Sequence, residues 1–356
     1  MTSTHDRPVT LRDVAERAGV HPSTASRILS GSRRGDPDVA RRVSQAAAAL
    51  GYRTNRIARA LRQQSSSTVG MAVPDLENPF FPALVKSVES ALNAEGYALV
   101  LCDAQDNPAV ERQRIDTLLE RQVDGLILCP VHLTGSLPAV RQAAAQVPVV
   151  QVDRRVPAPT DFVGVDQASV IGLAVDHLES LGRRRLAFLT AAEENSPIAE
   201  RGVAYRRRMA DDPDALDAIR VGALTLEWGL RAVDEMLASP TPLPDGLICA
   251  NDLIALGAMQ RLRRAGVRVP EDVAVTGVDD TPFGRVSEPE LTTVRQPVEQ
   301  VGEEAVAMLL ARLGDARRAD RQRATHNLVL SPSLLVRRST VPAADPAPAA
   351  AEGGGR

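Results

Sequence analysis

Apolar residues near the start of the chain repeat at the spacing of a short amphipathic helix. Leu11, Val14, Ala15 and Ala18 follow the i, i+3, i+4, i+7 pattern, which predicts one buried helical face. Gly19 follows directly, and a glycine after the last apolar position is typical of a turn that ends a helix. The pattern therefore predicts the first helix of a helix-turn-helix pair.

A second short helix is predicted after this turn. Pro22 suits a first helical turn, because the N–H that proline lacks would have no partner there. Ala25, Ile28 and Leu29 form the apolar face of this helix. The residues left facing outward are Ser23, Thr24, Ser26 and Arg27. A short polar helix that presents an arginine and rests on a few apolar side chains suits the major groove of DNA.

Two more helical segments are predicted before the body of the chain. Residues 36–50 begin with Asp-Pro-Asp and end before a glycine, as helices often do. A shorter helix follows, with Asn55 as a suitable N-cap, the small residue Ala58, and Leu61 as a large apolar group on a basic strip. Leu61 either packs inside a linker helix or contacts a partner. A serine-rich linker, residues 63–68, comes next.

From residue 68 onward, short apolar runs alternate with helical patterns. The predicted strands are 69–73, 98–102, 125–129, 147–152, 162–165, 185–189, 246–249 and 273–277. The helical stretches between them include 81–95, 109–122, 170–181, 230–238 and 252–265. Continuous apolar strands separated by helices are typical of parallel sheets covered on both faces, and so many units favour two α/β lobes. Lobes of this kind bind ligands outside the carboxyl ends of their strands.

Charge is divided unevenly along the chain. The formal net charge is −3, yet residues 1–64 hold 12 Arg and only 5 acidic residues. A basic N-terminal module on an acidic body predicts a polyanion partner for that module alone.

Cysteine usage and hydropathy predict the compartment. Cys102, Cys129 and Cys249 are isolated, without metal-ligand spacing, which is typical of reduced thiols in a cytosolic protein. The sequence has neither a secretory signal nor an apolar run of about 18 residues. We expect a cytoplasmic protein that contacts no membrane and needs no metal or cofactor.

The N-terminal segment closely resembles the helix-turn-helix headpiece of the lactose-repressor (LacI/GalR) family of bacterial transcription regulators. Tyr52, Asn55, Ala58 and Leu61 also follow the order of that family's hinge helix. Phrases in the body match too, among them Pro-Asp-Leu-Glu-Asn-Pro-Phe-Phe at 74–81 and Leu-Thr-Thr-Val-Arg-Gln-Pro at 291–297. The resemblance implies an α/β fold class: a three-helix headpiece, a hinge helix, and a two-lobed core like that of type I periplasmic binding proteins, with two parallel sheets covered by helices on both faces.

The resemblance also sets the expected domain bounds. They are 1–54 for the headpiece, 55–67 for the hinge helix and linker, 68–340 for the effector-binding and dimerisation core, and 341–356 for a disordered tail. The N-terminal lobe would comprise about 68–165 and 292–325, and the C-terminal lobe about 166–291 and 326–340. The chain would cross between the lobes near Val165, Leu291 and His326.

In the headpiece, the resemblance implies a division of DNA contacts. Ser23 and Arg27 would read bases, whereas Thr10 and Thr24 would bind phosphates. Pro22 and Ser23 replace longer side chains of some relatives, so that recognition would depend more on Arg27 and on DNA shape.

At the hinge, the resemblance implies a homodimer on a palindromic operator in double-stranded DNA. Asn55 and Ala58 would allow two hinge helices to pair in the minor groove, where Leu61 would wedge between base pairs. The tail has no heptad pattern, so a dimer is expected rather than a coiled-coil tetramer.

In the core, the resemblance implies a small-molecule effector bound between the lobes. The candidate contacts are Phe80, Phe81, Asp103, Asp153, Arg201, Asn251, Asp279 and Gln296. Carboxylates, amides and a guanidinium around an apolar wall suit a neutral polyol such as a sugar. Asp153 either contacts the effector or caps a helix, and for Asp252 and Asp280 capping is the expected role.

Two positions depart from the sugar-responsive pattern of the family. Leu224 stands where many members carry an aromatic residue, and Trp228 lies four residues further on. Trp228 either replaces the stacking platform or packs within its own lobe. Either outcome leaves the identity of the effector open.

The resemblance implies a transcription repressor, not an enzyme, controlled allosterically by its effector. The effector could either release the protein from DNA or recruit it. One alternative is a cytosolic α/β enzyme acting on sugars, but the sequence contains no nucleophile elbow, phosphate loop or histidine cluster. The other is a solute-binding protein of a transporter, which would have no use for residues 1–64.

Overall fold

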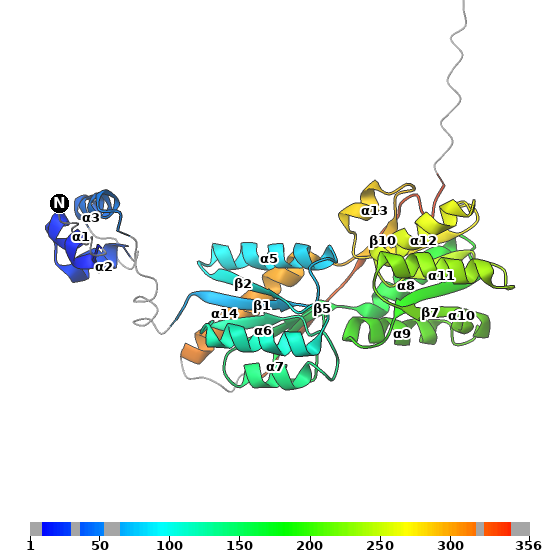
Figure 1. The fold of residues 1–356 in the computed structure, drawn as a ribbon, viewed down its shortest axis with the longest axis horizontal. Helices are drawn as coiled ribbons and strands as arrows, with labels where there is room; N and C mark the ends of the chain where they lie inside the picture. Colours follow the sequence, from blue (N-terminus) through cyan, green and yellow to red (C-terminus); the bar gives the residue numbers. More distant parts are fainter. Residues whose placement is uncertain (1–8, 30–35, 53–64, 318–323, 343–356) are drawn as a thin grey trace, which may run out of the picture. The chain divides into compact units, whose positions relative to one another are not determined.

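The computed structural model describes residues 9–29, 36–52, 65–317 and 324–342 of the chain (Figure 1). The chain divides into two compact units, Met1–Ser66 and Ser67–Arg356. The predicted hinge residues Asn55, Ala58 and Leu61 lie outside the described residues, as does nearly all of the predicted tail.

The first unit contains the helices that the apolar spacing predicts. They are α1 (Leu11–Ala18), α2 (Pro22–Leu29) and α3 (Pro37–Ala49). Val14, Ala15, Ala25 and Val43 are fully buried where the helices meet. Gly19 ends α1 with a left-handed φ of 65°, a conformation that favours glycine, and this turn sets the direction of α2.

The first lobe of the second unit is built on a parallel sheet. Among the described residues it has six strands, in the order β11-β5-β4-β3-β1-β2. These are β1 (Thr68–Val73), β2 (Ala98–Asp103), β3 (Gly125–Leu128), β4 (Val149–Val152), β5 (Asp161–Val165) and β11 (Asn327–Leu330). Its helices are α5 (Phe80–Ala94), α6 (Pro108–Glu120), α7 (Leu137–Ala144) and α14 (Val298–Arg317). Helices α5 and α14 pack together on one face, and α6 and α7 cover the other (Figure 1).

The second lobe repeats this architecture. Within the described ranges its sheet has six strands, in the order β12-β10-β9-β8-β6-β7. These are β6 (Leu186–Ala191), β7 (Ile219–Gly222), β8 (Gly246–Cys249), β9 (Ala274–Val278), β10 (Thr292–Arg295) and β12 (Ser333–Leu335). Its helices are α8 (Gln167–Ser180), α9 (Ser196–Arg208), α10 (Pro213–Asp217), α11 (Leu226–Ala238), α12 (Asp252–Arg264) and α13 (Pro282–Val286). The short strand β12 is antiparallel to β10, so this sheet is not wholly parallel as predicted.

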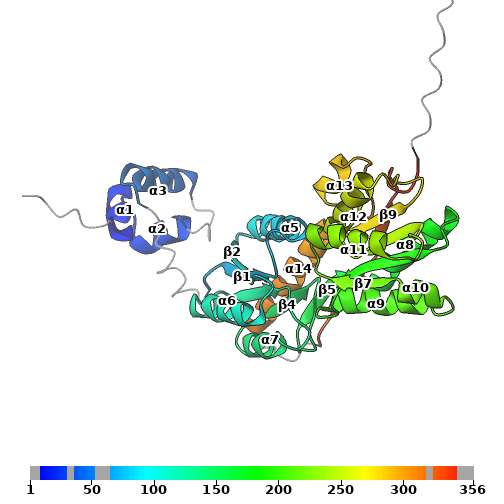
Figure 2. The ribbon, with the colours of Figure 1, turned by 45° about the vertical axis from the view of Figure 1, so that its right-hand side comes forward.

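Helices α11 and α12 lie side by side on one face of the second sheet, and α8 packs with α9 (Figure 2). The first pair approaches closely because a glycine stands on each helix. A Cβ atom at Gly229 would lie 2.1 Å from the carbonyl oxygen of Ile254, and one at Gly257 would lie 2.1 Å from that of Leu226. This contact holds the N-terminus of α12 in place beside the sheet.

The crossings between the lobes differ in part from those predicted. The first follows β5 at Val165, as expected. The second follows Arg295 rather than Leu291, because 292–295 pairs with β9 and belongs to the second sheet. The third follows Leu330 rather than His326, because 327–330 pairs with β5 in the first sheet. Residues 292–295 and 327–330 therefore belong to the opposite lobes from those predicted.

Candidate DNA-binding surface and effector cleft

The outward side of α2 carries the predicted base-reading residues. Ser23 and Arg27 are exposed, whereas Pro22 and Thr24 are half-buried. The Ser23 hydroxyl lies 2.8 Å from Nδ1 of His21, and Nε of Arg27 donates to the carbonyl oxygen of Ser23 at 3.2 Å. These contacts orient both side chains without burying either one.

Thr10 already has a structural role at the start of α1. Its Oγ1 accepts a hydrogen bond from the backbone N–H of Asp13 at 3.4 Å, and its own N–H donates to the Asp13 carboxylate at 2.8 Å. This reciprocal pair is a capping box, which satisfies backbone donors at a helix N-terminus. A phosphate contact by Thr10 therefore stays a prediction, alongside a capping role that the structure shows.

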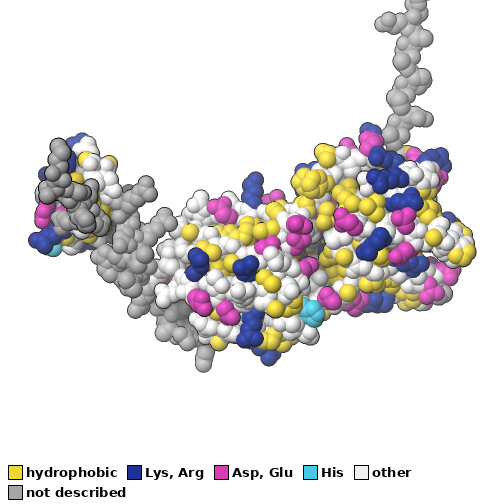
Figure 3. Space-filling view, viewed as in Figure 1, with side chains coloured by type: hydrophobic (Ala, Val, Ile, Leu, Met, Phe, Trp, Pro, Cys, Tyr) yellow, Lys and Arg dark blue, Asp and Glu magenta, His cyan; other side chains and the backbone are white. Residues whose placement is uncertain are grey.

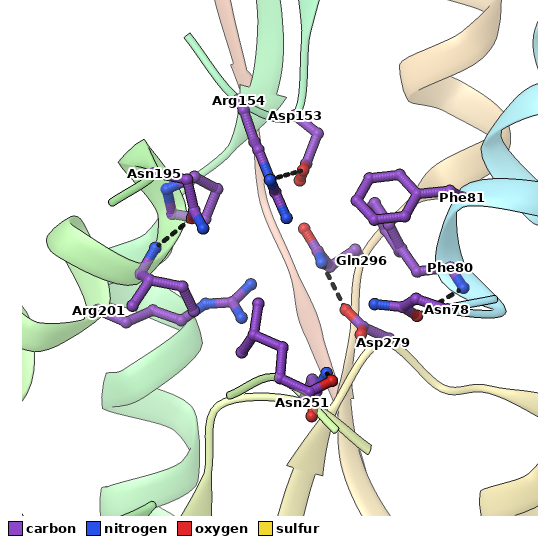
Figure 4. Close-up of a pocket in the computed structure, with 13 residues that line it drawn as sticks. Asn78, Phe80, Phe81, Asp153, Arg154, Asn195, Arg201, Asn251, Asp279 and Gln296 are labelled. Atoms are coloured by element: carbon purple, nitrogen blue, oxygen red, sulfur yellow. Dashed lines mark hydrogen bonds and ion pairs between the residues drawn. The ribbon is translucent and has the colours of Figure 1, made fainter. Parts of the chain in front are cut away.

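A cleft between the two lobes of the core collects most of the predicted effector residues (Figure 4). Seven of the eight predicted residues, all within the described ranges, line it: Phe80, Phe81, Asp153, Arg201, Asn251, Asp279 and Gln296. The other described lining residues are Asn78, Arg154, Asn195, Pro197, Ile198 and Leu224. Asp103 is absent from this lining, because β2 is the edge strand of the first sheet and the Asp103 carboxylate accepts the N–H of Gln105 at 2.9 Å. We therefore withdraw Asp103 from the effector set.

The apolar wall of the cleft comes from the start of α5. Oδ1 of Asn78 accepts the N–H of Phe80 at 3.1 Å, which fixes the first turn of the helix. The rings of Phe80 and Phe81 meet edge to face with centroids 5.2 Å apart. The guanidinium of Arg154 lies 5.4 Å from the centre of the Phe81 ring. Asn78 lies two residues before Phe80, and Arg154 directly follows Asp153; this closeness to predicted residues is the signal that could have found them.

Asp153 brings a buried carboxylate into the cleft from the end of β4. Its φ of 58° is left-handed, so the chain turns sharply there and directs both Asp153 and Arg154 toward the cleft (Figure 4). Burial raises the pKa of Asp153, and the nearby Arg154 and Arg201 oppose that rise. Nε of Arg154 lies 3.9 Å from Oδ2 of Asp153.

Arg201 is the buried cation of the second lobe. From α9, its Nε donates to Oε1 of Gln167 at 2.8 Å and its Nη1 donates to the carbonyl oxygen of Ala250 at 2.5 Å. Burial lowers the pKa of Arg201, while the carboxylates of Asp279 and Asp153 oppose that fall. These contacts fix the guanidinium plane at the wall of the cleft.

Asp279 and Gln296 face each other across the end of the second sheet. Nε2 of Gln296 donates to Oδ1 of Asp279 at 2.7 Å. Burial raises the pKa of Asp279 to about 8, despite the opposing effect of Arg201. Oε1 of Gln296 is buried and has no hydrogen-bond partner among the described residues. An unpaired buried acceptor costs free energy, so this oxygen favours a ligand that brings a donor.

Asn251 and Asn195 both cap helices at the cleft. Oδ1 of Asn251 accepts the N–H of Ile254 at 2.9 Å, and its Nδ2 donates to the carbonyl oxygen of Leu224 at 3.2 Å. Asn195 caps α9 in the same way through the N–H of Ile198. Their side chains therefore shape the cleft, and the NH₂ group of each amide keeps donor capacity for a ligand.

Trp228 packs within the second lobe rather than lining the cleft. Its Nε1 donates to the carbonyl oxygen of Thr190 at 3.1 Å, and its ring lies against Gly222, where a Cβ atom would be 2.1 Å from the indole. Leu224 lines the cleft instead. The aliphatic wall at Leu224 thus takes the place of an aromatic stacking platform.

Neither Asp252 nor Asp280 faces the cleft. The buried carboxylate of Asp252 accepts hydrogen bonds from Thr293 Oγ1 and from the N–H and hydroxyl of Thr281, and burial raises its pKa to about 6. Asp280 pairs with arginines. Both carboxylates therefore hold loops together instead of capping helices as predicted.

The cleft is narrow, with a cavity volume of about 30 Å³. That is room for about two water molecules, since one needs about 10–15 Å³ of such space, so the entry of a sugar-sized ligand requires the lobes or side chains to move apart. In the part of the chain that the structure describes, no cluster of His, Cys, Asp and Glu could hold a metal ion. No helix in the described ranges is long and apolar enough to cross a membrane.

A helix-turn-helix unit followed by a two-lobed α/β core with a polar interlobe cleft defines a DNA-binding regulator with a small-molecule effector domain. Residues 10–55 match the model of bacterial regulatory proteins of the lacI family, and residues 175–340 match a periplasmic binding protein-like domain. The chain belongs to the lacI family of bacterial transcription regulators.

Relatives and solved structures agree with this assignment. The chain is 34% identical to the HTH-type transcriptional regulator MalR of Streptomyces coelicolor, over 94% of this chain and 97% of the relative. It is 31% identical to the ribose operon repressor of Escherichia coli, over 85% of this chain and 93% of that protein. The fold resembles the lac repressor dimer bound to operator and the anti-inducer ONPF, with a TM-score of 0.81, 27% identity and coverage of 94% of this chain and 99% of that one. It also resembles a complex of the transcriptional regulator CelR with cellobiose, with a TM-score of 0.68, 31% identity and coverage of 93% and 99%.

Proposed function

We propose that this chain is a repressor that binds a palindromic operator as a homodimer and is controlled by a neutral, polyhydroxylated effector in the interlobe cleft. The observation that carries the effector assignment is the unpaired, buried Oε1 of Gln296 beside the Asp279 carboxyl. A hydroxyl group both donates and accepts hydrogen bonds, so it can pair with both side chains at once.

The charge balance of the cleft supports a neutral effector. The cations of Arg154 and Arg201 face the carboxyls of Asp153 and Asp279. These four groups are formally two cations and two carboxyls, and the hydroxyl groups of a neutral ligand can donate to or accept from each of them. Two similar proteins are named for sugars, the ribose operon repressor and the CelR–cellobiose complex, which favours the same ligand class.

The exposure of Ser23 and Arg27 on α2 supports the assignment of DNA contacts to this helix. Ser23 and Arg27 would read bases, with Thr10, Pro22 and Thr24 beside the backbone. The solved lac repressor is a dimer on operator DNA, and the present chain would pair in the same way. The visible face of the core shows acidic and basic side chains interspersed (Figure 3), whereas the sequence of residues 1–64 has a strong excess of arginine. DNA binding is therefore assigned to the N-terminal module.

Control of DNA binding would follow from linkage between the two sites. An effector that prefers one arrangement of the lobes shifts the population toward it, and the affinity for operator changes by the same factor in return. The narrow cleft favours a movement of the lobes, or of side chains that line them, when a ligand enters. We assign no catalytic activity to the chain and place it in the cytoplasm, since its relatives are transcription regulators.

The test is selection from a random duplex pool by the full-length protein, followed by gel shifts with ribose and cellobiose. We expect enrichment of a palindromic sequence and a sugar-dependent change in its affinity, whose direction distinguishes release from recruitment. Arg27→Ala serves as the control that loses sequence preference. Absence of any enriched palindrome would refute the operator assignment.

A further inference from the structure

One buried carboxylate next to the cleft holds several segments of the second lobe together. In the described structure, three arginine side chains converge on Asp280. Arg285 Nη2 lies 2.7 Å from Oδ2 of Asp280, Arg295 Nε lies 3.0 Å from the same oxygen, and Arg337 Nη2 lies 2.5 Å from Oδ1. The Asp280 side chain is only 2% exposed. These contacts tie the loop after β9 to α13, to the end of β10 and to the chain after β12.

The contact between Asp280 and Arg295 runs beside the effector residues. Asp279 precedes Asp280 and Gln296 follows Arg295, so the Asp280–Arg295 ion pair and the Asp279–Gln296 hydrogen bond join the same two segments. Backbone contacts join them as well. The N–H of Asp279 donates to the carbonyl oxygen of Val294 at 3.0 Å, and the N–H of Asp280 donates to Oγ1 of Thr293 at 3.3 Å.

The backbone at this point needs outside support. Asp279 has a φ of 113° and Asp280 a φ of 56°, so consecutive non-glycine residues lie in the left-handed region. Such conformations cost free energy and persist only where the surroundings fix them. Burial alone would raise the pKa of Asp280, but hydrogen bonds from Arg285 and Arg337 outweigh it and keep that pKa below its ordinary value. Asp280 is thus held as a carboxylate that anchors the turn.

We propose that Asp280 and Arg295 are positioning residues for effector recognition: their ion pair fixes the turn and the crossover strand that present Asp279 and Gln296 to the ligand. The inference rests on the proposed function of the cleft. Arg285 donates to both carboxylate oxygens of Asp280 but stands on α13, which contributes no lining residue to the cleft. The loss of Arg295, whose neighbour Gln296 lines the cleft, should therefore disturb the cleft more than the loss of Arg285.

Arg285 and Arg295 form a matched pair for the experiment. Their side chains are 51% and 48% exposed, so Arg285→Gln and Arg295→Gln each remove one half-exposed guanidinium group from the same carboxylate. Arg285 donates two hydrogen bonds to Asp280, so this control removes at least as strong a contact as Arg295→Gln does. Neither substitution creates a cavity, and full-length protein with either one should melt within a few degrees of the wild type.

Two measurements on the full-length variants decide the question. Amide hydrogen exchange without ligand should be faster at Asp279 and Asp280 in Arg295→Gln than in Arg285→Gln. Titration with ribose and cellobiose should show roughly threefold to thirtyfold weaker sugar binding in Arg295→Gln, and a smaller change in Arg285→Gln. Equal exchange at Asp279 and Asp280 in both variants, or equal sugar affinity in both, would overturn the inference.

The two hypotheses fail differently. If neither sugar raises the melting temperature of the wild type, the proposed sugar effector is wrong. The exchange comparison still decides whether Arg295 positions the turn, because it needs no ligand.

Discussion

The two units of the chain present their recognition groups in opposite ways. On α2, Ser23 and Arg27 are exposed, and each makes a hydrogen bond with a residue a few positions away. In the cleft, Arg201 and Asp153 are buried, Asp279 is half-buried, and all three are held by partners. Exposed groups can change with little effect on folding, whereas removal of one buried partner leaves the others unpaired. Specificity for DNA should therefore be separable from stability, and specificity for the effector should not.

The largest expected effect tests the buried side of this comparison. Arg201→Met leaves Oε1 of Gln167 and the carbonyl oxygen of Ala250 without a donor and the cleft carboxyls without their cation. We expect the core to lose about 3–5 kcal/mol of unfolding free energy, measured by thermal or urea unfolding. The control is Arg207→Met, an exposed position on the same helix. Equal unfolding curves for the two variants would contradict the role given to Arg201.

The next effect concerns pH. Because burial raises the pKa of Asp279 to about 8, the folded chain binds this proton more tightly than the unfolded chain does. The stability that depends on this group is therefore present at low pH and is lost as the pH rises toward 8. In Asp279→Asn this titration is absent, so the melting temperature of the variant relative to the wild type should increase from pH 5 to pH 8. Parallel curves would show that Asp279 titrates normally; Asp103→Asn, outside the cleft, is the control.

A smaller effect is expected on DNA discrimination by the exposed residues of α2. Arg27→Ala should reduce discrimination between operator and random DNA by about 1–3 kcal/mol, with unchanged melting of the protein. Competition gel shifts at fixed salt measure this difference. The control is Arg12→Ala on α1, where the side chain pairs with Glu16 and is 82% exposed. An equal loss on all DNA sequences would assign Arg27 to the phosphates instead.

The smallest effect concerns Thr10, an exposed residue that also takes part in folding. Thr10 is a predicted phosphate contact that also caps α1. Unlike Ser23 and Arg27, this exposed residue should therefore affect the stability of the protein. Thr10→Ala should weaken α1 by about 1 kcal/mol, seen as faster amide exchange along that helix in the full-length chain. Thr10→Ser keeps the hydroxyl and should restore protection.

The sequence predicts local structure well where apolar spacing is regular. The helices of the first unit and most core strands follow directly from it, because a buried face needs apolar residues at the period of its element. Strands β7, β10, β11 and β12 were not predicted, since each has only three or four residues and includes a polar one. The sequence predicts that the chain crosses between the lobes, but it does not show which sheet a short strand joins. The second and third crossings were therefore predicted a few residues too early.

The cleft shows the same limit. The family resemblance implied Asp153 and Asp279 as effector contacts, and both line the cleft. It implied Asp103 as well, but β2 lies at the sheet edge, and sheet order depends on tertiary packing rather than on local pattern. Arg154 was missed because only the left-handed turn at Asp153 brings the next side chain toward the same space. The support that Asp280 gives to its neighbour depends on Arg295 and Arg337, which local sequence does not connect to it.

The position of Trp228 has a practical consequence. It is the only tryptophan of the chain, and its indole is seated against Gly222 and Thr190, close to the strand end that leads to Leu224. Intrinsic fluorescence excited at the indole band therefore comes from one lobe alone. A change in its emission on ligand addition would report a change in packing near Thr190 and Gly222, in the unlabelled protein and in real time.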